Sequence, residues 1–207
     1  MCFSAEASFA ASGLLAASGI AISRLPKAQA SVPLALFPAV FATHQFIEGV
    51  LWLNQDGVLP DTYKSAAVYA YALIAFVLWP IYVPLAAYLT ETGRRRRITI
   101  LICQAIGLAV GLALLLSFFR HPPTVTTDCC SLVYWVNAPE WLLAPYLIAV
   151  TIPFLACSRR SLALFGLGIA VSCAVTLAVA SAPAFPSVWC FFAAVLSAGL
   201  YLSLIHI

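Results

Sequence analysis

Charged side chains are scarce in this sequence, and the scarcity bounds what the chain can be. Asp, Glu, Lys and Arg make up 8% of the 207 residues, whereas 64% are hydrophobic. Soluble domains carry about 25% charged residues. The composition therefore excludes an ordinary soluble domain and predicts an all-α membrane protein. The basic residues, which leave a net charge of +3, stand in short clusters between apolar runs, so we expect no nucleic-acid partner.

Lysine and arginine are missing from two places where particular functions need them. No basic residue precedes Arg24. A secretory signal peptide needs a basic segment before its apolar run, so we expect the first apolar run to be retained as a helix. No lysine follows Lys64. A retinal Schiff base requires a lysine in the last span, and a conventional rhodopsin is therefore excluded.

The seven cysteines contain no C-x-x-C pair. Metal-ribbon and thioredoxin sites consequently have no support. Cys129 and Cys130 are adjacent, and they are candidates for a reactive pair or for a disulfide to Cys2 or Cys190 on an oxidising side of the membrane.

Seven apolar runs approach the ~20 residues that a helix needs to cross a bilayer. We predict a single domain over residues 1–207, a seven-transmembrane-helix bundle. The predicted spans are residues 5–23, 32–53, 64–90, 98–119, 140–157, 162–182 and 188–205. The longest connection, residues 121–139, carries Tyr134 and Trp135, and we expect it to pack on the membrane surface.

The orientation follows from the positive-inside rule. Eight of the ten basic residues fall in alternate connections: Arg24 and Lys27, Arg94 to Arg97, and Arg159 and Arg160. Cytoplasmic loops carry such an excess of Lys and Arg. We therefore expect a multi-pass protein of the cell inner membrane with its N-terminus outside and its C-terminus inside. On the outer side, Trp52, Trp135, Trp141 and Trp189 would belong to the interfacial belt.

Small residues and prolines predict how the helices pack. Ser8, Ser12, Ala16 and Gly19 share one stripe of the first span, and Gly107 and Gly111 have the G-x-x-x-G spacing of a close helix contact. In the second span Pro38 should bend the helix. Pro80 lacks an N–H and leaves a carbonyl four residues back without a donor, so a kink is expected in the third span.

One polar group interrupts the apolar second span: His44, Gln45 and Glu48, with Trp52 one turn further on. Residues four apart share a helix face, and ionisable residues inside a span are costly. The group predicts an outward-facing polar pocket for a small ligand, an ion or a proton-active group. The alternative is a hydrogen-bonded His–Glu pair that only joins helices. The pocket candidates are Cys2, Ser4, His44, Gln45, Glu48, Trp52 and Glu140.

A divalent metal such as zinc is a second interpretation of the same residues. Imidazole and carboxylate groups are competent ligands for such an ion. His44 and Glu48 supply two ligands, and His121 is the first candidate for a third. The remaining candidates are Asp128, Cys129, Cys130, Glu140 and Cys2, whose thiol would stand beside the terminal amine if Met1 were removed.

Three segments carry a resemblance to a known family. They are Met1-Cys-Phe-Ser-Ala-Glu-Ala-Ser-Phe9, the block His44-Gln-x-x-Glu-Gly-x-x-Trp52, and Phe76-x-x-Trp-Pro-x-x-x-Pro84. Together they resemble an uncharacterised family of small bacterial integral membrane proteins, a domain of unknown function. The resemblance covers roughly the first 95 residues, and it implies a multi-helix membrane fold and no particular activity. The last five residues, Ser203–Ile207, are similar to translated sequencing-adapter read-through, so His206 is left out of every site.

Two functions follow as hypotheses. The first is binding, sensing or transport, with membrane lipids as surroundings and a small ligand on the outer side. The second is an intramembrane metal-dependent hydrolase acting on lipid, because the seven-span, N-out plan resembles the ceramidase and adiponectin-receptor hydrolases at the level of the fold. Those enzymes use several histidines, whereas this chain offers His44 and His121.

Overall fold

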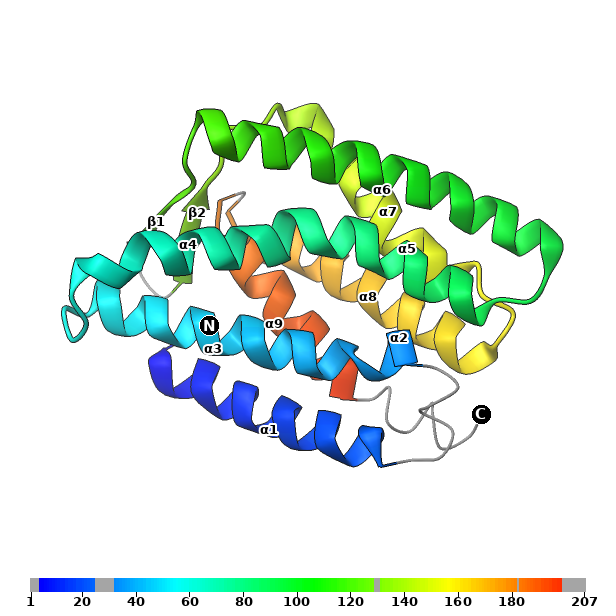
Figure 1. Cartoon of the computed structure of the whole chain (residues 1–207), viewed down its shortest axis with the longest axis horizontal. Helices are drawn as coiled ribbons and strands as arrows, with labels where there is room; N and C mark the ends of the chain where they lie inside the picture. Colours follow the sequence, from blue (N-terminus) through cyan, green and yellow to red (C-terminus); the bar gives the residue numbers. More distant parts are fainter. Residues whose placement is uncertain (1–3, 25–31, 129–130, 182, 199–207) are drawn as a thin grey trace.

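The computed structural model describes residues 4–24, 32–128, 131–181 and 183–198, and this part is a bundle of helices with one β-hairpin (Figure 1). The elements are α1 (Ala5–Ser23), α2 (Val32–Ala35), α3 (Phe37–Gln55), η2 (Asp61–Tyr63), α4 (Lys64–Ala72), η3 (Leu73–Leu78), α5 (Trp79–Thr90), α6 (Arg94–Arg120), β1 (Thr124–Asp128), β2 (Ser131–Trp135), η4 (Glu140–Leu142), α7 (Leu143–Leu155), α8 (Arg160–Val179) and α9 (Phe185–Ala198).

Five helical segments in the described part are long and apolar enough to cross a membrane. They are Ala5–Ser23, Val32–Gln55, Asp61–Thr90, Arg94–Arg120 and Arg160–Val179. Two further apolar helices, Glu140–Leu155 and Phe185–Ser197, are shorter. These seven helices correspond to the seven predicted spans, of which five have the predicted crossing length.

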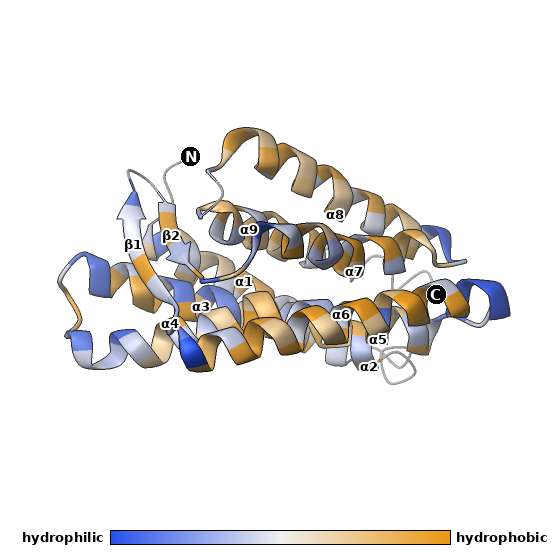
Figure 2. Cartoon of the chain, turned by 90° about the horizontal axis from the view of Figure 1, so that it is seen from above, coloured by the Kyte–Doolittle hydropathy of each residue, from blue (hydrophilic) through white to orange (hydrophobic). Residues whose placement is uncertain are grey.

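Apolar side chains cover the outside of the bundle as well as its interior. On α6, Leu101, Ile102, Leu108, Leu112 and Leu116 are all exposed, and Figure 2 shows apolar colour along the length of the helices with hydrophilic colour near their ends. A helix that is apolar on all sides suits a lipid surrounding.

The first helix packs on the third through the predicted small-residue stripe. Ser4 is the N-cap of α1, and its side chain accepts a hydrogen bond from the Ala7 N–H. The Ser12 hydroxyl donates to the Ala42 carbonyl over 2.8 Å. A Cβ added at Gly19 would lie 3.6 Å from the nearest atom of α3, so the two helices are in van der Waals contact there.

Proline interrupts the second and third spans, as the sequence predicts. The second span divides at Leu36, between α2 and α3, with Pro38 in the first turn of α3. In the third span the six residues of η3 form a π-helix that ends just before Pro80. Because Pro80 has no N–H, the Phe76 carbonyl loses its donor four residues on, and the wider turn forms where the α-helical ladder is broken.

Gly107 and Gly111 lie at a close contact between α6 and the third span, as predicted. A Cβ at Gly107 would stand 1.8 Å from the Pro80 carbonyl oxygen, and one at Gly111 would stand 3.0 Å from the Ile81 side chain. Only glycine allows α6 to approach α5 this closely at residue 107.

The connection after α6 contains a hairpin that the all-α prediction lacked. β1 and β2 pair antiparallel, with Val125 opposite Tyr134 and Asp128 opposite Ser131. The Tyr134 N–H donates to the Pro183 carbonyl over 2.9 Å, which ties β2 to the connection before α9. β-branched residues from Thr124 onward favour a strand, and three consecutive buried residues of β2 hold the hairpin against the helices.

A buried carboxylate joins two connections at the opposite end of the bundle. Glu91 is 4% exposed. It accepts hydrogen bonds from the N–H groups of Thr92 (2.9 Å) and Gly93 (2.6 Å) and from the N–H (2.5 Å) and hydroxyl (3.0 Å) of Ser158. Burial raises the pKa of Glu91, but these hydrogen bonds outweigh it, and the pKa lies below its ordinary value of 4.5. Arg96 adds hydrogen bonds to the carbonyls of residues 156 and 157.

Candidate functional site

The polar group of α3 lies fully inside the protein. His44 and Gln45 are 0% exposed and Glu48 is 2% exposed. The Glu48 carboxylate accepts a hydrogen bond from the Gln45 amide over 3.1 Å and a second one from the Ser187 hydroxyl of α9. Glu48 therefore links α3 to α9 through neutral donors, and both ring nitrogens of His44 are without a hydrogen-bond partner.

Three stacked rings extend this group toward the hairpin. The ring centroids of His44 and Tyr71, the latter on α4, are 4.1 Å apart. The ring centroids of Tyr71 and Tyr134, the latter on β2, are 4.0 Å apart, and the two rings are parallel to within 1°. The hydroxyls of Tyr71 and Tyr134 are buried close to each other, but they do not form a hydrogen bond of normal geometry. Such groups are rare in folded proteins because each carries a desolvation cost.

The thiol of Cys190 on α9 completes the buried polar cluster, which we define as His44, Gln45, Glu48, Tyr71, Tyr134, Ser187 and Cys190. Cys190 is a buried free cysteine, and Glu48 lies within electrostatic range of it and of both tyrosines. The cluster thus gathers side chains from α3, α4, β2 and α9 around one carboxylate.

A cavity of about 570 Å³ adjoins this cluster. It lies between the end of β2, η3, η4, α6, α7 and the start of α9, and we call it the hairpin cavity. Tyr134 and Cys190 belong both to its wall and to the buried polar cluster. The rest of the wall is mainly apolar and aromatic, with Glu140 at the start of η4 as a charged member.

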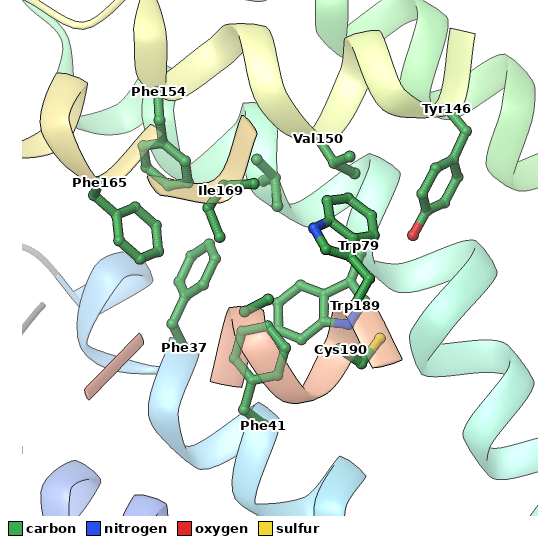
Figure 3. Close-up of a pocket in the computed structure, with 12 residues that line it drawn as sticks. Phe37, Phe41, Trp79, Tyr146, Val150, Phe154, Phe165, Ile169, Trp189 and Cys190 are labelled. Atoms are coloured by element: carbon green, nitrogen blue, oxygen red, sulfur yellow. The ribbon is translucent and has the colours of Figure 1, made fainter. Parts of the chain in front are cut away.

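Deeper in the bundle lies a small aromatic chamber of about 40 Å³, drawn in Figure 3. Phe37 and Phe41 of α3, Trp79 of α5 and Phe154 of α7 point into it. Tyr146, Trp189 and Cys190 line both this chamber and the hairpin cavity. The chamber is apolar and has room for about one water-sized group.

A model of a family of unknown function, DUF6629, matches residues 1–205. The chain belongs to this family. No curated protein and no solved structure matches the chain. The predicted resemblance to an uncharacterised family is therefore confirmed, and any function of this family member has to be argued from the site itself.

The structure separates the predicted pocket residues into three groups. His44, Gln45 and Glu48 lie together in the buried polar cluster, behind the wall of the hairpin cavity. Glu140 lines that cavity. Ser4 serves as a helix cap, and Trp52 packs in a core cluster with Tyr71 and Tyr134, its indole N–H unpartnered. Cys2, Cys129 and Cys130 lie outside the described residues, so the reactive pair and the disulfide stay predictions, although Cys190 itself is free.

The proposed metal ligands are not brought together in the described part of the chain. His121 is exposed at the end of α6, whereas His44 and Glu48 are buried in the bundle. Among residues 4–24, 32–128, 131–181 and 183–198, no three His, Cys, Asp or Glu side chains gather closely enough to hold an ion.

Two details of the site differ from the sequence-based expectation. The hydrogen-bonded His44–Glu48 pair, which was the alternative to a pocket, does not form, because Glu48 is bonded to Gln45 and Ser187 instead. Of the four tryptophans expected in the interfacial belt, Trp135 and Trp141 are exposed, while Trp52 and Trp189 are buried. The last two are core residues because they pack inside the bundle.

Sequence reasoning missed four members of the buried polar cluster: Tyr71, Tyr134, Ser187 and Cys190. Ser187 and Cys190 are three residues apart and share a face of α9, but no spacing along the chain relates this pair to Tyr71, to Tyr134 or to His44 and Glu48. The β-branched run before Asp128 was the available signal for the hairpin, and through it for Tyr134.

Proposed function

We propose that this protein crosses the inner membrane seven times with its N-terminus outside, and that it binds a small, largely apolar molecule in the hairpin cavity. The starts of α6 and α8, which carry Arg94 to Arg97 and Arg159 and Arg160, lie at the end of the bundle opposite the hairpin (Figure 1). The positive-inside rule would place that end in the cytoplasm and the cavity near the outer surface. Membrane lipids would surround the helices.

The observation that carries the proposal is a cavity of about 570 Å³ that shares Tyr134 and Cys190 with the buried polar cluster. Small-molecule sites are typically clefts of about 300–1,000 Å³ with mostly apolar walls and a few convergent polar groups. The hairpin cavity has both properties.

Tyr134 and Cys190 place the wall of the cavity directly beside the buried polar cluster. A ligand in the cavity would contact the aromatic wall with its apolar part, and the Glu140 side chain could meet a polar group. Binding, as a receptor or carrier, is thus the activity that the geometry favours, and no observation in the described residues favours the lipid hydrolase.

Photoaffinity labelling tests the proposal. The purified protein in dodecyl maltoside is irradiated with a small uncharged diazirine, such as a trifluoromethyl-diazirinyl benzyl alcohol, and the labelled peptides are mapped by mass spectrometry. We expect saturable labelling on η4, β2 and the start of α9. Ala138→Phe fills the cavity from its wall and should reduce this labelling several-fold, whereas Ala113→Phe on the exposed side of α6 should not.

Labelling that is spread over the lipid-facing residues of α6 and that is unchanged by Ala138→Phe would overturn the proposal. Size-exclusion chromatography and circular dichroism before irradiation show whether both variants are folded, so that unfolding is not mistaken for this outcome.

A further inference from the structure

The wall of the hairpin cavity has an uneven balance of charge. Among the described residues that line it, Glu140 is charged and negative, and none is Lys, Arg or His. The Glu140 carboxylate therefore favours a positively charged occupant over a negatively charged one.

Aromatic rings make up much of the same wall. They are Phe76, Tyr134, Trp135, Tyr146, Phe185 and Trp189. The face of an aromatic ring carries a negative electrostatic potential that attracts cations, with tryptophan the strongest of the three ring types. Aromatic walls of this kind bind alkylated ammonium groups, which also need apolar contact around the charge.

The hydrogen-bond donors of three wall residues are already used within the protein. The Trp189 indole N–H donates to the Ser172 hydroxyl over 3.2 Å, and the Tyr146 hydroxyl donates to the carbonyl of residue 75 over 2.6 Å. The Trp135 indole N–H donates to the Thr126 hydroxyl over 3.1 Å. These donors are not available to an anion or a carbonyl ligand, so the wall offers ring faces and acceptors more than donors.

We propose that the hairpin cavity binds an organic ammonium ion, an amine that carries apolar or methyl groups around its charge. This inference rests on the proposed function, since it names the chemical class of the molecule bound there. Two sources share this chemistry: a free amine reaching the outer face and the quaternary ammonium headgroup of a lipid. The Glu140 carboxylate would balance the charge near the cavity mouth, and the aromatic rings would surround the alkyl groups.

An isosteric pair of competitors tests the charge. Choline and 3,3-dimethyl-1-butanol have the same shape and differ in having nitrogen or carbon at the branched centre. Each is titrated against the uncharged photoprobe in dodecyl maltoside, and loss of label on η4 and α9 is measured. We expect choline to compete about three- to fivefold better, which corresponds to the usual strength of one cation–π contact.

Matched variants locate the effect. Glu140→Gln and Trp135→Leu should each reduce the preference for choline about threefold and leave competition by the alcohol unchanged. Asp56→Asn removes an exposed acid at the same end of the bundle, and Trp141→Leu removes an exposed indole next to Glu140 that does not line the cavity. Both controls should keep the wild-type preference.

The outcomes distinguish binding in the cavity from a preference for ammonium ions. If the photoprobe does not label the cavity at all, the proposed function fails. If the probe labels the cavity but choline and the alcohol compete equally, or if Glu140→Gln has no effect on their ratio, cavity binding stands and the ammonium class is wrong. Phosphatidylcholine added to the micelles distinguishes the two sources. If the site takes a lipid headgroup, the added lipid occupies it and choline competes less well with the photoprobe. If the site takes a free amine, competition by choline is unchanged.

Discussion

Replacing Gly107 by alanine is the sharpest test of the bundle, because the new methyl group would meet backbone. Its Cβ would stand 1.8 Å from the Pro80 carbonyl oxygen and 2.8 Å from the carbonyl carbon. An α-helical carbonyl at this position would be bonded to the N–H of residue 84, but residue 84 is also proline. The Pro80 carbonyl therefore turns to α6, where a Cα–H of Gly107 occupies the direction of the missing Cβ.

The size of the effect follows from these distances. Ordinary contacts of a Cβ begin at 3.4 Å. The Pro80 carbonyl is a backbone group and cannot rotate away as a side chain could. The helices α5 and α6 would therefore have to separate by about 1.6 Å to restore a distance of 3.4 Å. The packing of Gly111 on Ile81 would be lost with this separation. Overpacking in a well-packed core costs about 1–3 kcal/mol and occasionally more. We expect the free energy of unfolding to fall by about 3 kcal/mol.

The assay is equilibrium unfolding of the purified protein in mixed micelles, followed by tryptophan fluorescence and circular dichroism. Gly13→Ala is the matched control, since no atom lies within 4 Å of a Cβ at Gly13. Alanine there should stabilise α1 by about 0.5–1 kcal/mol through helix propensity. If Gly107→Ala were as stable as Gly13→Ala, the close contact between α5 and α6 would not exist as described.

Three further predictions concern buried hydrogen bonds. The pKa of Glu91 is lowered in the folded protein, so its contribution to stability is complete above its ordinary pKa of 4.5 and is lost as the pH falls through the folded-state value. The free energy of unfolding, measured between about pH 6 and about pH 3, should show this loss. In Glu91→Gln this pH dependence should be absent. Ser187→Ala removes one of the two side-chain donors of the Glu48 carboxylate and should cost about 1–3 kcal/mol, with Ser187→Thr restoring part of it; an unchanged midpoint would argue against the bond. Tyr146→Phe keeps the ring but leaves the Ala75 carbonyl without its donor, so it should cost about 1 kcal/mol in the same unfolding assay, and a gain in stability would refute the assignment.

Local features of the helices could be predicted from the sequence because they depend on near neighbours along the chain. Ser4 as a cap, the break near Pro38, the distortion before Pro80 and the contact face of Gly107 follow from a single residue type or a fixed spacing. The described structure contains each of them.

The site could be predicted only in part, because periodicity places a residue on a face of its own helix and does not name the helix opposite. His44 and Glu48 were recognisable as costly polar residues in an apolar span. Their partners come from elements that are far away in the sequence: Glu48 and Ser187 are 139 residues apart. Around His44 and Glu48 the structure places hydroxyls, an amide and stacked rings, which the sequence could not show because it gives no distance between such groups. The metal site stays a prediction, since three of its candidate ligands, Cys2, Cys129 and Cys130, lie outside the described residues.

The contacts of Tyr134 have a consequence for how the protein is assembled. The Tyr134 ring of β2 stacks on the Tyr71 ring of α4, and the Tyr134 N–H donates to the carbonyl of residue 183, just before α9. The wall of the cavity therefore needs β2, which follows α6, and α9, which is synthesised after the other elements of the wall. During synthesis the early helices can insert and pair while the cavity is still open on one side. Ligand affinity should thus appear only after α9 has docked, so chains truncated before residue 185 should not bind.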